Sequence, residues 1–111
     1  MFGELSMADL RPETTGTGFI IHVYKDVDQR AKHSPRIKVF PGRPSAGNSI
    51  SISIPRVGEP KIVAGKSQPP FVGKSLAQLF MFVEVNRAVL LQYWYNDLYF
   101  TEDLLRDLRR V

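Results

Sequence analysis

At 111 residues, with 43% hydrophobic and 23% charged residues, the chain has the size and composition of one folded domain. It contains no cysteine, which excludes disulfide frameworks, thiolate nucleophiles and cysteine-ligated zinc. The longest nearly apolar stretch, residues 76–85, is far shorter than the roughly 20 residues of a membrane span. Residues 1–10 lack the pattern of a secretory signal, so we expect a cytoplasmic protein.

The formal net charge of +4 is distributed unevenly. Residues 30–74 hold nine basic residues and one acidic residue, Glu59, which gives this segment a net charge of +8. Concentrated positive charge attracts anionic partners, of which nucleic acids are the commonest. A solubilising surface of ordinary lysines and arginines explains the same pattern, so the charge alone leaves both interpretations open.

The N-terminal part of the chain is expected to lie outside the main fold. Residues 1–17 mix small, polar and charged types, which predicts a partly ordered arm with one short helical turn near residues 6–10. We expect a single domain over residues 18–111.

Stretches rich in β-branched residues predict strands at residues 19–24, 36–40 and 49–54, with a shorter fourth at residues 61–64. In the second strand, Ile37 and Val39 alternate with Arg36 and Lys38, so the two cations share the outer face. In the third strand, three isoleucines alternate with three serines, which predicts one core face.

Apolar residues at helical spacing predict one long helix over residues 75–95, begun by a capping box of Ser75 and Gln78. A short final helix begins near Thr101. The expected fold is α+β: a small antiparallel sheet of three or four strands packed on one long C-terminal helix, with the short helix at its edge. The predicted core joins the isoleucines of the third strand to apolar residues of the helix, namely Ile50, Ile52, Ile54, Leu79, Val83 and Leu90.

The first half of the long helix is apolar nearly all round. Opposite the sheet-facing positions lie Met81, Phe82 and Val85, and soluble monomers rarely leave such a surface in water. These residues predict an interface with a second copy of the chain or with another protein.

The sequence has no Walker loop, no metal-binding histidine pair and no nucleophile elbow, so it predicts no cofactor and no metal, and it leaves open whether the chain is an enzyme. His22 lies in a strand, which favours a packed or surface histidine. His33, in a polar loop beside Lys32, is the catalytic candidate. The candidates for binding nucleic acid are six cations of the basic segment: Lys32, Arg36, Lys38, Arg43, Arg56 and Lys61.

Two segments resemble motifs of a widespread family of small bacterial proteins of unknown function. The first, His33-Ser34-Pro35-Arg36-Ile37-Lys38-Val39, resembles the family's His-Pro-Pro-His-x-His-Val segment, which follows an early strand. The second, residues 84–94 (EVNRAVLLQYW), resembles the family's C-terminal helix of the type Asn-Arg-x-x-Leu-Leu-x-x-Trp. Arg36 and Lys38 stand where the family has its second and third histidines, a change that keeps anion binding and removes proton transfer near neutral pH.

Many members of that family are encoded beside a small partner and are regarded as components of toxin–antitoxin modules. We therefore expect a toxin–antitoxin-type protein that binds RNA or another polyanion through its basic sheet and loops and is neutralised by a protein partner. The alternative is a non-enzymatic interaction module that forms a homo- or hetero-oligomer. A third hypothesis is a metal-independent nuclease that uses His33 with Arg36 and Lys38.

Overall fold

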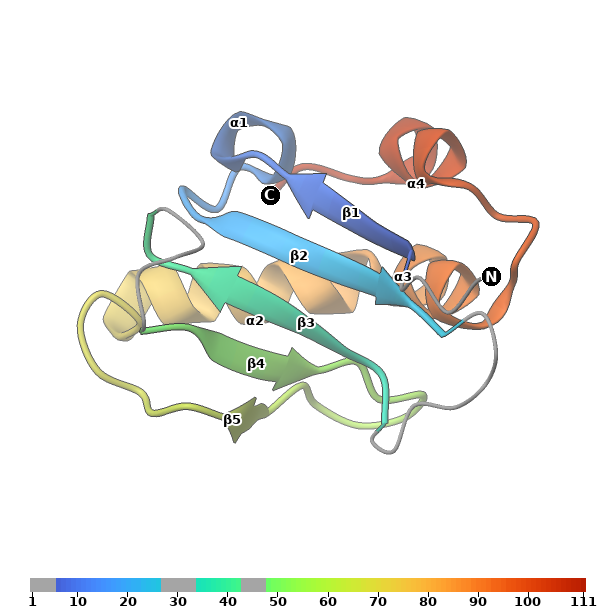
Figure 1. The fold of residues 1–111 in the computed structure, drawn as a ribbon. Coiled ribbons are helices and arrows are strands. Elements are labelled where there is room, and N and C mark those ends of the chain that lie inside the picture. The colour runs from blue at the N-terminus through green and yellow to red at the C-terminus, as the bar shows by residue number, and fades with distance from the viewer. Residues whose placement is uncertain (1–5, 27–33, 43–47) are drawn as a thin grey trace.

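The computed structural model describes residues 6–26, 34–42 and 48–111. Its centre is a five-stranded antiparallel sheet in which neighbours in sequence are neighbours in space, in the order β1-β2-β3-β4-β5 (Figure 1). The strands are β1 (Ser6–Leu10), β2 (Ile20–Lys25), β3 (Arg36–Phe40), β4 (Ile50–Ser53) and β5 (Ile62–Ala64).

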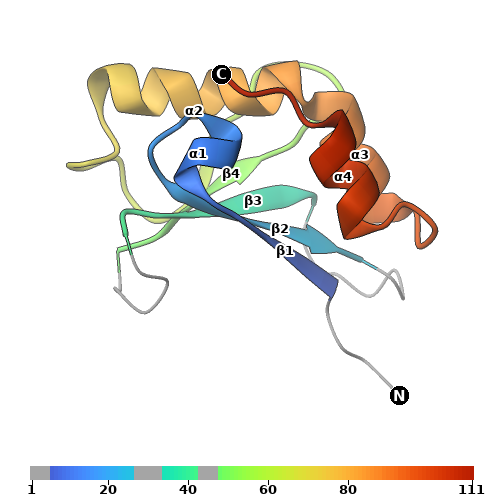
Figure 2. The same cartoon turned by 90° about the horizontal axis from the view of Figure 1, so that it is seen from above.

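The helices of the described residues lie on one side of this sheet. They are α1 (Pro12–Thr15), α2 (Gly73–Val85), α3 (Arg87–Tyr95) and α4 (Thr101–Asp107). Figures 1 and 2 show α2 and α3 crossing one face, with α1 and α4 at the β1 edge on the same side. The described helices therefore cover one face of the sheet and leave the other uncovered.

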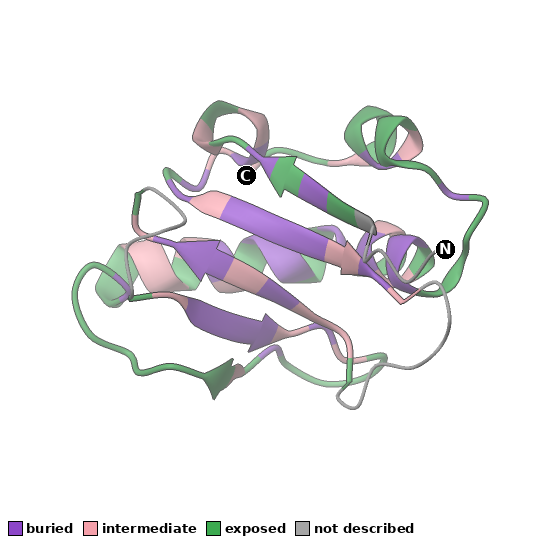
Figure 3. Ribbon diagram, viewed as in Figure 1, coloured by how far each residue is buried: buried purple, intermediate pink, exposed green. Residues whose placement is uncertain are grey.

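Alternation along the strands explains which face is covered. The antiparallel register pairs Val23 with Ile37 and Ile37 with Ile52, so apolar side chains line up across three strands, and all three of these residues are fully buried. Figure 3 shows burial concentrated in β2, β3 and β4, whereas β5 is exposed. The predicted core is confirmed, because the following residues belong to one buried cluster: Ile50, Ile52, Ile54, Leu79, Val83 and Leu90.

The expected α+β class is correct, but the sheet has five strands where the sequence predicted three or four. The additional strand is β1, in the segment predicted to be an arm with a helical turn. Ala8 and Leu10 are almost completely buried in β1, which pairs with residues 21–25 of β2. Of the rest of the predicted arm, Pro12–Thr15 form α1, and residues 1–5 lie outside the described residues.

The turn after α1 is in contact with the last residues of the chain. Gly16 ends α1 with φ 80°, a left-handed conformation that glycine adopts without strain. A Cβ at this position would lie 2.1 Å from the carbonyl oxygen of Val111. The Val111 amide also donates to the Thr15 carbonyl (2.9 Å), so the C-terminal segment packs directly on this turn.

The predicted single helix over residues 75–95 is wrong, because α2 ends at Val85 and α3 begins at Arg87. Asn86 separates them: its side chain donates to the Phe82 carbonyl (3.0 Å) and to the Arg109 carbonyl (2.8 Å), and it accepts from the Arg109 amide (2.6 Å). A side chain that bonds to the preceding turn commonly bends a helix. Figure 2 shows the change in direction between α2 and α3.

The capping box predicted for this helix does not form. The chain becomes helical at Gly73, and its N-cap residue, Val72, makes no side-chain capping bond. Gln78 instead donates to the Gly16 carbonyl (2.8 Å), which ties α2 to the turn after α1.

Candidate nucleic-acid interface

The uncovered face of the sheet carries the two cations that the alternation of β3 predicted. Arg36 and Lys38 are half-buried on this face, while Ile37 and Val39 between and beyond them are fully buried on the other. The register places Lys38 between His22 of β2 and Ser51 of β4. Two residues apart on one strand, the cations lie about 7 Å apart, which is close to the spacing of neighbouring phosphates.

Arg36 lies in a second row of the same face. It pairs with Ser53 of β4, and extending the β2–β3 register by one residue places Tyr24 on its other side. Each cation is therefore flanked by an aromatic ring from β2 and a small hydroxyl from β4. We call this surface the basic–aromatic face. Its residues are Tyr24, His22, Arg36, Lys38, Phe40, Ser51 and Ser53.

The aromatic rings of this face contact one another. The centroid of the His22 ring lies 4.6 Å from that of Phe40 and 6.3 Å from that of Tyr24. Lys38 Nζ lies 5.5 Å from the Phe40 centroid, within cation–π range. Packing of this kind holds Lys38 against a flat apolar surface.

His22 is packed, as the sequence analysis favoured, at only 8% exposure. Its Nε2 lies 2.9 Å from Asp9 Oδ1 of β1, a close contact that lacks the geometry of a hydrogen bond. Partial burial, and secondarily the Asp9 charge, raise the pKa of Tyr24. Tyr24 therefore remains a neutral hydroxyl near neutral pH, and Asp9 makes the β1 side of the face the less favourable one for anions.

The other predicted binding residues gather at one end of the face or fall outside the described residues. Lys61 is exposed and lies beside Ser53, whose Oγ accepts the Lys61 amide (2.9 Å). Arg56 is also exposed, with the guanidinium carbon 4.9 Å from the centroid of the Tyr95 ring. Lys32, the catalytic candidate His33, and Arg43 lie outside the described residues.

The predicted interface residues divide between surface and core. Met81 and Val85 are 54% and 45% exposed. Phe82 is fully buried, so its assignment to an interface was wrong. It lies one turn from Leu79 on the side of α2 that packs on the sheet, because residues three apart share a helix face.

Sequence reasoning missed the role of Lys25 at the end of β2. This lysine is 3% exposed, and its three N–H groups donate to the carbonyls of Tyr93 (2.9 Å), Asn96 and Tyr99 (2.6 Å). Burial lowers the pKa of Lys25, while the charges of Asp97 and Asp103 act in the opposite direction. The signal was available in the alternation, since Lys25 follows Ile21 and Val23 on the core-facing side.

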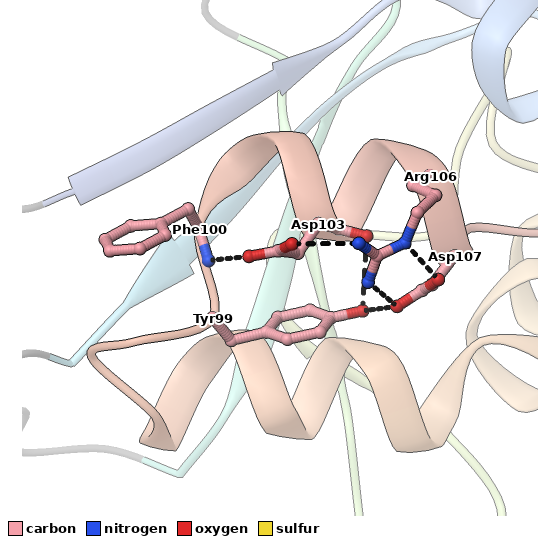
Figure 4. A network of polar contacts seen from close by, with 5 residues as sticks. All are labelled: Tyr99, Phe100, Asp103, Arg106 and Asp107. Atoms are coloured by element: carbon pink, nitrogen blue, oxygen red, sulfur yellow. Dashed lines mark hydrogen bonds and ion pairs between the residues drawn. The ribbon is translucent and has the colours of Figure 1, made fainter.

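A second polar network surrounds α4 (Figure 4). Arg106 makes two hydrogen bonds to the Asp107 carboxylate (both 2.9 Å) and one to Asp103 (3.1 Å), and the Tyr99 hydroxyl donates to Asp107 (2.7 Å). Burial, and next the bond to Asp107, raise the pKa of Tyr99 to about 12. The bonds from Arg106 and then Tyr99 hold the pKa of Asp107 at about 2. The guanidinium of Arg106 is thus neutralised by carboxylates, in contrast to Arg36 and Lys38.

The described residues form neither a metal-ligand cluster nor a membrane-spanning helix. Within residues 6–26, 34–42 and 48–111, no three histidine, aspartate or glutamate side chains gather as ligands for a metal ion. In the same ranges, every helix is too short or too polar to cross a membrane. Comparisons with protein-family models, with curated proteins and with solved structures gave no match.

Proposed function

We propose that the chain binds single-stranded RNA through the basic–aromatic face. The observation that carries this proposal is the placement of Arg36 and Lys38 between aromatic rings and serines on the face that the described helices leave uncovered. The cations can contact phosphates, and the partly exposed ring of Tyr24 can stack on an unpaired base, while the buried rings of His22 and Phe40 support the two cations from below. A surface that served only solubility would need neither aromatic rings beside the cations nor two cations on the same face of one strand.

The charges around this face support the same proposal. Among the described residues, neither Arg36 nor Lys38 has a carboxylate partner, and Arg36 Nε is 3.4 Å from the Ser34 carbonyl oxygen. In the basic segment, the one acid is Glu59. Two cations without carboxylate partners retain their charge for a polyanion.

The resemblance adds a protein partner to this proposal: a toxin-like chain whose RNA-binding face an antitoxin-like protein covers. Induced expression of the chain should then slow the growth of a bacterial host. Replacing both Arg36 and Lys38 by Gln should relieve that effect, as should co-expression of the protein encoded beside the chain. Equal growth inhibition by wild type and the double variant would show that toxicity does not depend on Arg36 and Lys38.

A non-enzymatic interaction module is the second candidate, and it is favoured by the exposure of Met81 and Val85 one turn apart on α2. A partner bound there would lie on the helix side of the sheet, opposite the basic–aromatic face (Figure 2). The two functions therefore use different surfaces, so variants on one surface should leave the other function intact.

Direct binding tests the RNA proposal. A labelled single-stranded RNA would be titrated at several salt concentrations with wild type, with Arg36→Gln/Lys38→Gln and with a control of equal charge change, Lys66→Gln/Lys74→Gln. Because each phosphate contact contributes about 0.7 to the slope of log K against log salt, the first double variant should lose about 1.4 from that slope. Equal effects of both double variants would show that only net charge matters. Cleavage of the labelled RNA would support the nuclease hypothesis.

A further inference from the structure

A pocket opens at the end of the basic–aromatic face, where β3 begins and β4 ends. Its volume is about 360 Å³, and its apolar lining includes Pro35, Pro55 and Tyr95. Its polar lining includes Ser53 and Arg56. This size and this mixture of apolar walls with few polar groups are typical of sites for small organic ligands.

Arg56 and Tyr95 form one wall of this pocket. The guanidinium carbon of Arg56 lies 4.9 Å from the centroid of the Tyr95 ring, and that ring is 41% exposed at the end of α3. A guanidinium packed on a ring presents both a flat surface for stacking and N–H donors at its edge. Among the described residues, no hydrogen-bond or ion-pair partner occupies those donors.

Holding the loop after β4 in place does not require this contact. Arg87 already donates to the Gly58 carbonyl (2.7 Å), and the Ile54 amide donates to the Pro35 carbonyl (2.9 Å). The loop is thus fixed at both of these points by other groups. The exposed Arg56–Tyr95 pair lines the pocket, where it can serve as a wall for a bound ligand.

The pocket adjoins the basic–aromatic face at Ser53. Ser53 belongs to both, because it lines the pocket and pairs with Arg36 across β3 and β4. Lys61 lies on the far side of Ser53 and donates its amide to the Ser53 hydroxyl. A strand of RNA bound along Lys38 and Arg36 would therefore have its next nucleotide beside Ser53, at the pocket.

We propose that this pocket takes one unpaired nucleotide of a single-stranded RNA, with the base against the Arg56–Tyr95 wall and the phosphate toward Arg36. A nucleotide matches the pocket because it is flat, aromatic and anionic at the same time. An inorganic anion would leave the apolar walls unused, and a paired base would be shielded inside its duplex. The proposal rests on the proposed function, because the RNA whose nucleotide enters the pocket is the RNA that the basic–aromatic face binds.

Nucleotide titration tests this pocket separately from the sheet face. Wild type would be titrated with 5′-AMP, 5′-UMP and inorganic phosphate by two-dimensional NMR, and with matched single-stranded and duplex RNA by anisotropy. We expect both nucleotides to bind more tightly than phosphate and to shift the resonances of Tyr95 and Ser53. Since stacking one base contributes about 1–3 kcal/mol, single strands should bind about tenfold more tightly than duplex.

The decisive variant is Arg56→Lys, which keeps the charge and removes the planar surface. It should weaken both nucleotide and single-strand binding about tenfold with an unchanged salt slope, whereas Lys66→Arg should have no effect. Nucleotides that bind no better than phosphate, or an Arg56→Lys protein that binds as wild type, would overturn the pocket proposal even while RNA still bound the sheet. Nucleotide binding without RNA binding would uphold the pocket and reject the proposed function. Arg56 is exposed, so this variant is expected to fold.

Discussion

The two faces of the sheet are formed by alternate residues of the same strands, yet they contain opposite kinds of side chain. On the covered face, Ile37 and Ile52 pack beneath the helices and are fully buried. On the uncovered face, the next residues along are Lys38 and Ser51, which pair with each other. Stability is therefore expected to depend on one face and binding on the other, and mutations one residue apart can separate them.

The largest contrast is expected between Ile52→Ala and Lys38→Gln. Removing buried methyl and methylene groups leaves a cavity, so Ile52→Ala should lower the free energy of unfolding by about 2–5 kcal/mol. Lys38→Gln changes a half-exposed side chain and should stay within about 0.5 kcal/mol of wild type. Denaturant melts of the two variants measure both values. Similar losses for both would mean that the uncovered face is also part of the stabilising core.

Lys25 and Lys38 provide the second contrast, since one lysine is buried and the other faces the uncovered side. Lys25→Met would leave the carbonyls of Tyr93, Asn96 and Tyr99 without their donor, and orphaned buried groups are costly. We expect a loss of about 2–3 kcal/mol in denaturant melts, with RNA binding retained once the protein is folded. RNA affinity that fell while stability held would assign Lys25 to the binding surface instead.

Much of the covered face could be predicted from the sequence, because alternation in β3 and β4 is a local pattern. The strand β1 could not, since residues 6–10 have little intrinsic preference for a strand and are held by pairing with β2 and by burial of Ala8 and Leu10. The break between α2 and α3 at Asn86 could not be predicted from the sequence either. Its partner, Arg109, is distant in the sequence, and helical periodicity continues through the break.

The uncovered face was only partly visible in the sequence. Arg36 and Lys38 followed from alternation, but the register that sets His22 beside Lys38 is a property of the folded sheet. The Arg56–Tyr95 wall joins a loop to the end of α3, and no short-range pattern signals such a contact. Phe82 was misassigned because the first half of α2 is apolar on most sides, so periodicity alone did not identify the buried one.

A third contrast separates cations that have carboxylate partners from those that do not. Asp107 has a pKa of about 2 in the folded chain, below its ordinary value of 3.8. The unfolded chain therefore takes up this proton first as the pH falls, and stabilisation present above about pH 4 is lost toward pH 2. Asp107→Asn should flatten the pH dependence of the melting temperature in this acidic range. An unchanged pH profile would show that the α4 network does not persist in solution.

The smallest effect is expected at the exposed residues of α2. Met81→Lys should change the free energy of unfolding by no more than about 0.5 kcal/mol, because the side chain is 54% exposed. It should also leave RNA binding unchanged, since α2 lies on the other side of the sheet. Light scattering at several concentrations measures the mass of both proteins. A wild type that is oligomeric while Met81→Lys is monomeric would favour the interaction module, and equal masses would exclude a homo-oligomer through Met81.

The most direct test of the central claim is to map where RNA contacts the chain. Single-stranded RNA that contains 4-thiouridine would be cross-linked by light to the wild-type protein, and the modified residues would be identified by mass spectrometry. We expect cross-links to Tyr24 and Lys38, which are partly exposed on the uncovered face, and to Tyr95 at its end. Cross-links confined to α2 or α4 would contradict the central claim.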